Sequence, residues 1–123
     1  KNKRSIIYVG NLVDFLYNCA LSKEALGKTF LISEKYSLST PEIIKLISAS
    51  LKVPLIIFPF PLGLSKKLAF IFGKENHFSK LSDSFEIDSS ESYKTLNWEP
   101  PFDVYYSFKI TAKWFFKKIG KKF

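Results

Sequence analysis

Helix-capping signals recur along the chain, and their spacing constrains the fold more than any other feature. The segment at residues 39–42, Ser-Thr-Pro-Glu, predicts a helix start, with either its serine or its threonine as the cap. Residues 88–91, Asp-Ser-Ser-Glu, repeat the capping signal. Asp103 is predicted to cap a last helix over residues 103–123. The chain is therefore divided into several short helices with extended segments between them.

Two short runs rich in β-branched and aromatic residues predict strands. The first covers residues 5–9, Ser-Ile-Ile-Tyr-Val, and ends at Gly10; the second covers residues 29–33, Thr-Phe-Leu-Ile-Ser. The apolar run 53–58 is also extended, and its prolines favour an edge or a connection. Strands that alternate with helices predict an α/β fold with a few short strands and several helices.

A helix is predicted between the first two strands. Asn11 is its expected N-cap and Gly27 its left-handed stop. Its apolar positions follow helical spacing and predict the face that packs on the core: Val13, Leu16, Tyr17 and Ala20.

Further helices are predicted toward the C-terminus. Residues 61–73 form one, and the helix that follows residues 88–91 ends at Asn97 in the left-handed region. The last helix is amphipathic. One side carries Val104, Phe108, Thr111 and Phe115, and another carries Lys109, Lys113 and Lys117.

Length and composition indicate one globular domain. The chain has 123 residues, 46% of them hydrophobic, so we expect a real core without disulfides or metals. Cys19 is the single cysteine, which excludes a disulfide scaffold and favours the reducing cytoplasm. No apolar run reaches the roughly 18 to 20 residues of a membrane span. Because the chain has no methionine and starts at Lys1, we expect it to be a C-terminal piece of a longer protein.

The net charge of +8 comes almost entirely from lysine, since Arg4 is the only arginine. Lysine provides a mobile point charge and does not read guanine edges as arginine does, so sequence-specific nucleic-acid binding is not expected. The lysines gather near the C-terminus among Trp114, Phe115, Phe116, Ile119 and Phe123. Such a tail is either a solvated face or, as an alternative function, a contact with an anionic membrane surface.

The chain carries no catalytic, cofactor or metal motif of its own. Its five glycines form no G-x-G-x-x-G, and no P-loop or zinc spacing occurs. His77 is interpreted as a solvated loop residue and Cys19 as a small core hydrophobe. The pair Tyr105 and Lys109 matches Tyr-x-x-x-Lys, but this short pattern arises easily by chance in a chain with six tyrosines.

Three segments in order resemble the C-terminal portion of the extended short-chain dehydrogenase/reductase family, which includes nucleotide-sugar epimerases and dehydratases. Residues 4–14 resemble the Arg-x-x-Ile-x-Val-x-Asp-Leu-x-Asp block of this family. Residues 27–42 resemble its Gly-x-x-strand passage with the following Ser/Thr-x-x-Glu, and residues 87–100 resemble its Asp-x-Ser to Leu-Gly-Trp-x-Pro ending. The resemblance covers nearly the whole chain, residues 1–123.

The resemblance implies the substrate-binding lobe of an NAD-dependent, UDP-glucose 4-epimerase-like enzyme of surface polysaccharide synthesis, without its nucleotide-binding Rossmann core. The missing part would hold NAD and the catalytic residues, so this piece alone is expected to be inactive. Arg4 matches the arginine that contacts the substrate diphosphate, and Lys80 roughly replaces a second arginine. A 4-ketoreductase or dehydratase of the same family is the alternative. The implied partners are a UDP-sugar and, in the full-length enzyme, a second copy.

Overall fold

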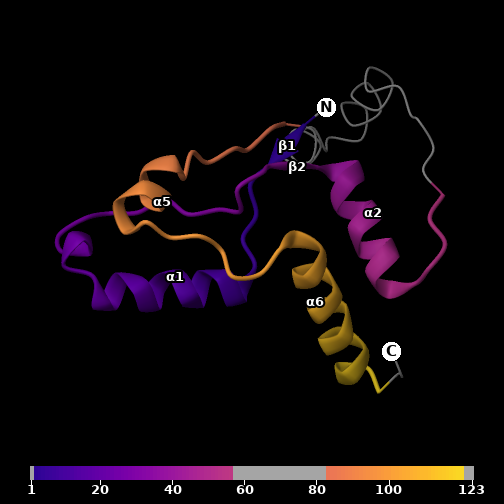
Figure 1. Ribbon diagram of the computed structural model, residues 1–123. Coiled ribbons are helices and arrows are strands. Elements are labelled where there is room, and N and C mark those ends of the chain that lie inside the picture. The colour runs from indigo at the N-terminus through magenta and orange to yellow at the C-terminus, as the bar shows by residue number, and fades with distance from the viewer. Residues whose placement is uncertain (1, 57–82, 121–123) are drawn as a thin grey trace, which may run out of the picture.

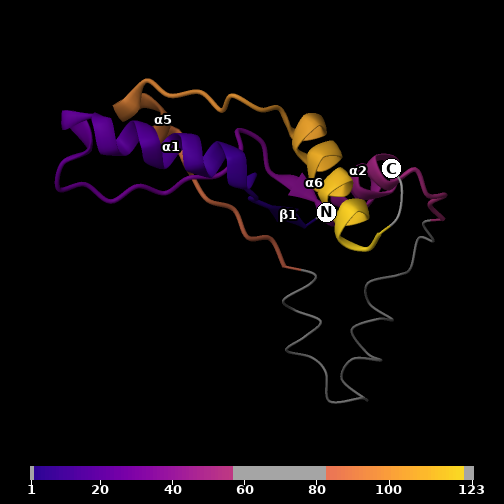
Figure 2. The same ribbon diagram turned by 90° about the horizontal axis from the view of Figure 1, so that it is seen from below.

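The computed structural model describes residues 2–56 and 83–120 and shows a mostly helical architecture. Its elements are β1 (Lys3–Arg4), α1 (Val9–Leu21), the 3-10 helix η1 (Lys23–Ala25), β2 (Leu38–Ser39), α2 (Thr40–Leu51), α5 (Ser90–Leu96) and α6 (Val104–Lys118). Helices α1 and α5 lie at one end, α2 and α6 lie together at the other, and the two strands lie between them (Figure 1; Figure 2).

The strand predictions are wrong in position, and the expected α/β fold is mostly helical, but the expectation of a few short strands with several helices is confirmed. β1 and β2 pair antiparallel, with Lys3 opposite Ser39 and Arg4 opposite Leu38. Residues 5–8 and 29–33 are irregular, and Val9 already belongs to α1. A β-branched run becomes a strand only when another strand satisfies its backbone. In the part of the chain that the structure describes, the paired strands are β1 and β2, and both lie outside the two predicted runs.

Helix α1 forms where expected, but its buried side is not the predicted one. It begins after Tyr8, so Asn11 lies inside the helix, fully buried, and is not the N-cap. The only buried apolar residue on α1 is Phe15. The predicted core stripe is exposed instead: Val13, Leu16, Tyr17 and Ala20. Helical periodicity finds an apolar face but does not say what covers it.

Three of the predicted helix boundaries are confirmed by local hydrogen bonds or backbone angles. Ser39 caps α2 in a full capping box with Glu42, which settles the choice between Ser39 and Thr40. Asp103 accepts a hydrogen bond from the Tyr106 N–H at 2.9 Å and caps α6. Asn97 ends α5 with φ of 45° in the left-handed region.

A fourth predicted boundary, the helix start at residues 88–91, is confirmed, since α5 begins at Ser90 after the N-cap Ser89. Ser89 makes no side-chain capping bond, and Asp88 accepts from the Ser90 N–H instead. The predicted end of the first helix is wrong. Helix α1 ends at Leu21, so Gly27, with φ of 68°, does not stop it but lies in the turn after η1.

The core in the described residues is smaller than composition suggests. Its centre is Phe15, whose ring packs edge-on against Phe30 and Trp98 at centroid distances of 5.7 and 5.1 Å. Tyr93 of α5 lies 5.2 Å from the Trp98 ring. Trp98 also donates its indole N–H to the Asp14 carboxylate at 2.6 Å, so this aromatic cluster ties α1 to α5 and the following connector.

Helix α6 packs beside α2, and its predicted amphipathic pattern is confirmed only in part. Phe108, Thr111 and Phe115 line a groove between the two helices, and the side that carries Lys109, Lys113 and Lys117 is exposed. Thr111 and Phe115 are nevertheless exposed, and the buried residues of α6 are Ser107 and Ala112. The helix ends at Lys118, before the predicted limit of residue 123. Three parts of the prediction lie outside the described residues: residues 121–123, the helix at 61–73, and residues 57–58 of the extended run.

Candidate functional site

Arg4 lies at the junction where three distant segments meet. Its backbone pairs with Leu38 of β2 on one side and forms a parallel bridge with Phe85 on the other. The flanking hydrogen bonds run from the Ser5 N–H to the Phe85 carbonyl at 2.9 Å and from the Phe85 N–H to the Lys3 carbonyl at 2.8 Å. The backbone of Arg4 is therefore fixed from both sides.

The Arg4 side chain is half-buried and directed along this junction. Its Nη2 donates to the Asp83 carbonyl oxygen at 3.2 Å. Neighbouring residues of a strand point to opposite faces, so the exposed Lys3 lies on the other face. Lys80, the second predicted contact of the substrate, lies outside the described residues.

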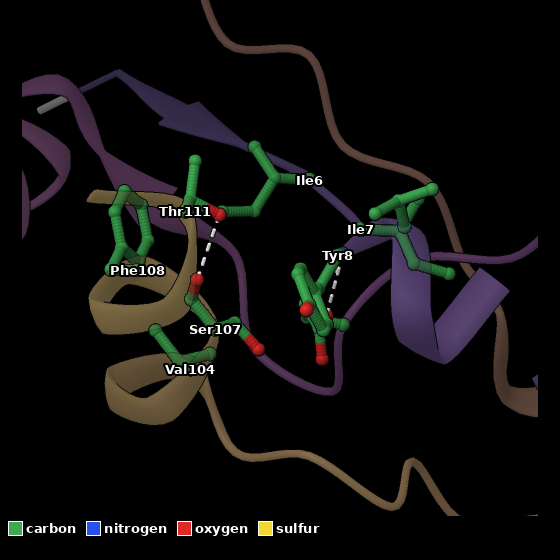
Figure 3. A pocket seen from close by; sticks show the side chains of 9 residues that line it. Ile6, Ile7, Tyr8, Val104, Ser107, Phe108 and Thr111 are labelled. Carbon is green, nitrogen blue, oxygen red and sulfur yellow. Dashed lines mark hydrogen bonds between the residues drawn. The ribbon is translucent and has the colours of Figure 1, made fainter. Parts of the chain in front are cut away.

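A largely apolar cavity of about 320 Å³ lies between the segment that follows β1 and helix α6. Figure 3 shows its two walls: Ile6, Ile7 and Tyr8 face Val104, Ser107, Phe108 and Thr111. The hydroxyl groups of Ser107 and Thr111 donate to carbonyls of their own helix at 2.7 and 2.8 Å. The cavity can therefore accept a flat or apolar group, with few polar groups left to orient it.

The Glu34 carboxylate borders this cavity and holds its two walls in place. Glu34 is buried, and its Oε1 accepts from the Tyr8 N–H and from the Asn11 side chain, both at 2.9 Å. Asn11 also donates to the Phe102 carbonyl at 2.9 Å and accepts from the Phe102 N–H at 3.0 Å. These bonds join the start of α1 to the segment that leads into α6.

Neither Glu34 nor the buried position of Asn11 was found from the sequence. From the sequence, Asn11 is expected as a helix cap and as part of the 4–14 block, and Glu34 follows a predicted strand without a second acidic residue nearby at a spacing that would indicate a site. Their bonding depends on chain segments 23 and 91 residues apart, which no local pattern reports.

A second, polar cavity of about 360 Å³ lies on the other side of Glu34. The Ser33 and Ser89 hydroxyls are 2.9 Å apart there, and the Tyr93 hydroxyl donates to the Ser33 carbonyl at 2.9 Å. Burial, together with the charges of Glu34 and Glu99, raises the pKa of Tyr93 to about 12. A phenol held in this way is a poor proton donor at neutral pH, so Tyr93 serves as a structural hydrogen bond.

The other predicted site residues show no catalytic arrangement. Tyr105 and Lys109 lie on the exposed surface of α6 beside a shallow groove against α2. Partial burial raises the pKa of the Cys19 thiol, which disfavours the reactive thiolate. His77 lies outside the described residues.

The described residues do not form a dinucleotide cradle. The glycines among them, Gly10, Gly27 and Gly120, stand far apart, and no glycine-rich loop opens a helix. No group of three or more histidine, cysteine or acidic residues within 2–56 and 83–120 could hold a metal ion. Over the same residues, no helix has the length and apolar character needed to cross a bilayer.

Comparison with known proteins shows that the chain is related to a known enzyme. The chain is 32% identical over 115 residues to a UDP-glucose 4-epimerase from Vibrio cholerae. The match covers 94% of this chain but 35% of the relative, so the chain spans about a third of that enzyme's length. No protein-family model matches the chain, and no solved structure matches it. The relationship therefore rests on sequence and reaches nearly from end to end of this chain.

Proposed function

From its distant homology to UDP-glucose 4-epimerase, we propose that this chain is the substrate-side part of an NAD-dependent nucleotide-sugar epimerase. Its task in that enzyme is to bind the UDP-sugar, and its pathway is the synthesis of a surface polysaccharide. Catalytic residues and the dinucleotide site belong to other parts of the enzyme, because the described residues offer neither. Such an enzyme works in the cytoplasm, where its cofactor and nucleotide sugars are found.

The fixed position of Arg4 is the observation that carries this proposal. Two neighbouring segments hold its backbone, so its guanidinium starts from a preorganised place. The planar fork of five N–H donors suits the oxygens of a diphosphate better than the ammonium group of a lysine does. The sequence-based resemblance assigns the same role to this position.

The exposed apolar side of α1 supports the view that this chain packs on further polypeptide. Val9, Val13, Leu16, Tyr17 and Leu21 are each more than half exposed. An apolar stripe of this length on a helix normally faces a core. In an enzyme roughly three times longer than this chain, the remaining polypeptide can cover it.

The proposal is tested by titrating the full-length protein with UDP in a calorimeter. Arg4→Ala removes a charged contact with the diphosphate, so we expect Kd to rise about thirtyfold, equivalent to about 2 kcal/mol. Lys3→Ala is the matched control, because it removes one positive charge from the next position on the opposite face of β1. Its Kd should change less than threefold.

Two outcomes would count against the proposal. If Arg4→Ala and Lys3→Ala weaken binding equally, only general charge attraction acts, and Arg4 is no diphosphate contact. If the unmodified full-length protein does not bind UDP at all, the nucleotide-sugar assignment is wrong. Circular dichroism on each variant separates these results from a loss of folding.

A further inference from the structure

The exposed side of α6 combines lysines with an exposed tryptophan. This basic aromatic face consists of Lys109, Lys113, Trp114, Lys117 and Lys118, all of them exposed. No acidic residue follows Asp103 in the sequence, so nothing on the helix itself neutralises the lysines. The face is strongly positive from the first turns of the helix to its end.

The packing of α6 turns this face away from the rest of the domain. Ala112 is buried, and Phe108 and Phe115 line the groove against α2. Lys109, Lys113 and Lys117 follow one another at intervals of four residues and share one side of the helix. Lys109 also borders a shallow groove against α2, but all three side chains are exposed, so they remain accessible while α2 and α6 stay packed.

Trp114 lies between the lysine side and the groove against α2, which it helps to line, and it is not buried. Its side chain is 58% exposed, whereas Trp98, the other tryptophan of the chain, is 5% exposed. The Lys118 ammonium lies 5.1 Å from the centroid of the Trp114 ring. An exposed indole among lysines has an apolar body for lipid chains and an N–H for the headgroup region.

We propose that the basic aromatic face of α6 binds the surface of a membrane rich in anionic lipids. Lysine ammonium groups attract such a surface without the fixed geometry that arginine forks require, and no arginine lies on the face. The indole of Trp114 enters the interface between headgroups and chains. The contact is peripheral, since α6 is too short and too charged to span a bilayer. This inference stands apart from the proposed substrate role.

Vesicle co-sedimentation of the full-length protein tests the proposal. Vesicles of phosphatidylglycerol and phosphatidylcholine should bind the protein, and pure phosphatidylcholine vesicles should not. The triple change Lys109→Gln, Lys113→Gln and Lys117→Gln should weaken binding about a hundredfold, since each lysine near an anionic surface contributes about a factor of five. Higher salt should weaken the binding of the unmodified protein.

A matched triple change controls for net charge. Lys23 in η1, Lys28 just after it and Lys94 in α5 are exposed, and α1 and α5 lie at the end of the molecule opposite α6 (Figure 2). Changing these three lysines to glutamine removes the same charge and should alter vesicle binding less than threefold. Equal loss in both triple variants would overturn the proposal.

Trp114 gives an independent readout. Brominated lipids in the vesicles should quench its fluorescence, and the difference between the unmodified protein and Trp114→Phe isolates that signal from other tryptophans. Binding without this quenching would mean that another surface meets the lipid. If an RNA of similar charge binds more tightly than the vesicles and the α6 triple variant abolishes it, the face is a nucleic-acid surface. UDP affinity should be unchanged in every lysine variant, which keeps this test separate from that of Arg4.

Discussion

The two ends of the molecule are stabilised in different ways. At the α1–α5 end, buried polar groups join segments that are far apart in sequence: Asn11 binds the Phe102 backbone 91 residues away, and the Tyr93 hydroxyl binds the Ser33 carbonyl 60 residues away. At the α2–α6 end, two well-capped helices pack side by side through apolar groups. Removing one member of a buried polar network leaves its partners without hydrogen bonds. Truncating one side chain between packed helices removes only the contacts of that side chain.

The largest effect is expected where the aromatic cluster meets this network. Phe15→Ala opens a cavity beside Trp98 and should lower the free energy of unfolding by about 4 kcal/mol. Leu16→Ala, at the next position of α1 but 56% exposed, should cost less than about 1 kcal/mol. Urea denaturation followed by circular dichroism measures both. Similar losses for the two variants would show that α1 packs through its apolar stripe instead.

A somewhat smaller effect is expected at the centre of the polar network. Asn11→Ala removes the side chain that bridges Glu34 and the Phe102 backbone, and it leaves buried groups without a partner. The expected loss is about 3 kcal/mol. Asn18→Ala is the control, because the Asn18 amide binds only within its own helix, to Asp14.

The Asn18 variant should lose less than about 1 kcal/mol in the same denaturation experiment. A small loss for Asn11→Ala as well would remove the difference between the two ends. The α1–α5 end would then tolerate the loss of a buried partner as readily as a packed helix pair tolerates truncation.

At the α2–α6 end, removing the helix cap should have a modest effect. Asp103→Ala deletes the carboxylate that accepts from the Tyr106 N–H and should cost about 1 kcal/mol. Asp103→Asn keeps an accepting oxygen, so its loss should be only a few tenths of that amount. Thermal unfolding distinguishes the two. If Asp103→Ala lost more stability than Asn11→Ala, the α2–α6 end would be the more cooperative of the two ends.

The last effect is confined to high pH and concerns the pH dependence of the α1–α5 end. The pKa of Tyr93 is raised to about 12, above the value of about 10 for a free phenol. Between these values the unfolded chain releases the proton while the folded chain keeps it, so the free energy of unfolding should fall as pH rises above about 10. In Tyr93→Phe, which has no phenol at this position, the free energy of unfolding should fall less over the same pH range.

The corresponding measurement is urea denaturation at several pH values between 9 and 12, with Tyr105→Phe as the control. Tyr105 is 76% exposed, so its removal should leave the pH dependence unchanged. If Tyr93→Phe and the unmodified protein decline in parallel, the Tyr93 phenol ionises as it does in water.

Local features of the fold could be predicted from the sequence, and long-range ones could not. Ser39, Asp103 and Asn97 mark helix ends because each acts on backbone groups within a few residues of itself. The sequence does not distinguish the inner from the outer side of α1, because burial of Asn11 depends on Glu34 and Phe102, which are remote in sequence. Local periodicity contains no information about such partners.

In the candidate site, Arg4 could be predicted from the sequence and Glu34 could not. The resemblance singled out Arg4, and the structure places it at a three-segment junction that the sequence does not show. Glu34 carried no signal, since a single glutamate after an apolar run is common on protein surfaces. Its role follows only from the two N–H donors that converge on its carboxylate.

The bridge between Asn11 and the Phe102 backbone also bears on how the protein is made. A ribosome adds roughly 5 to 20 residues each second, so about 5 to 20 s pass between synthesis of the two partners 91 residues apart. Throughout that interval the Asn11 side chain lacks its partners on the Phe102 backbone. The final placement of α1 therefore has to wait until nearly all of this chain has been translated.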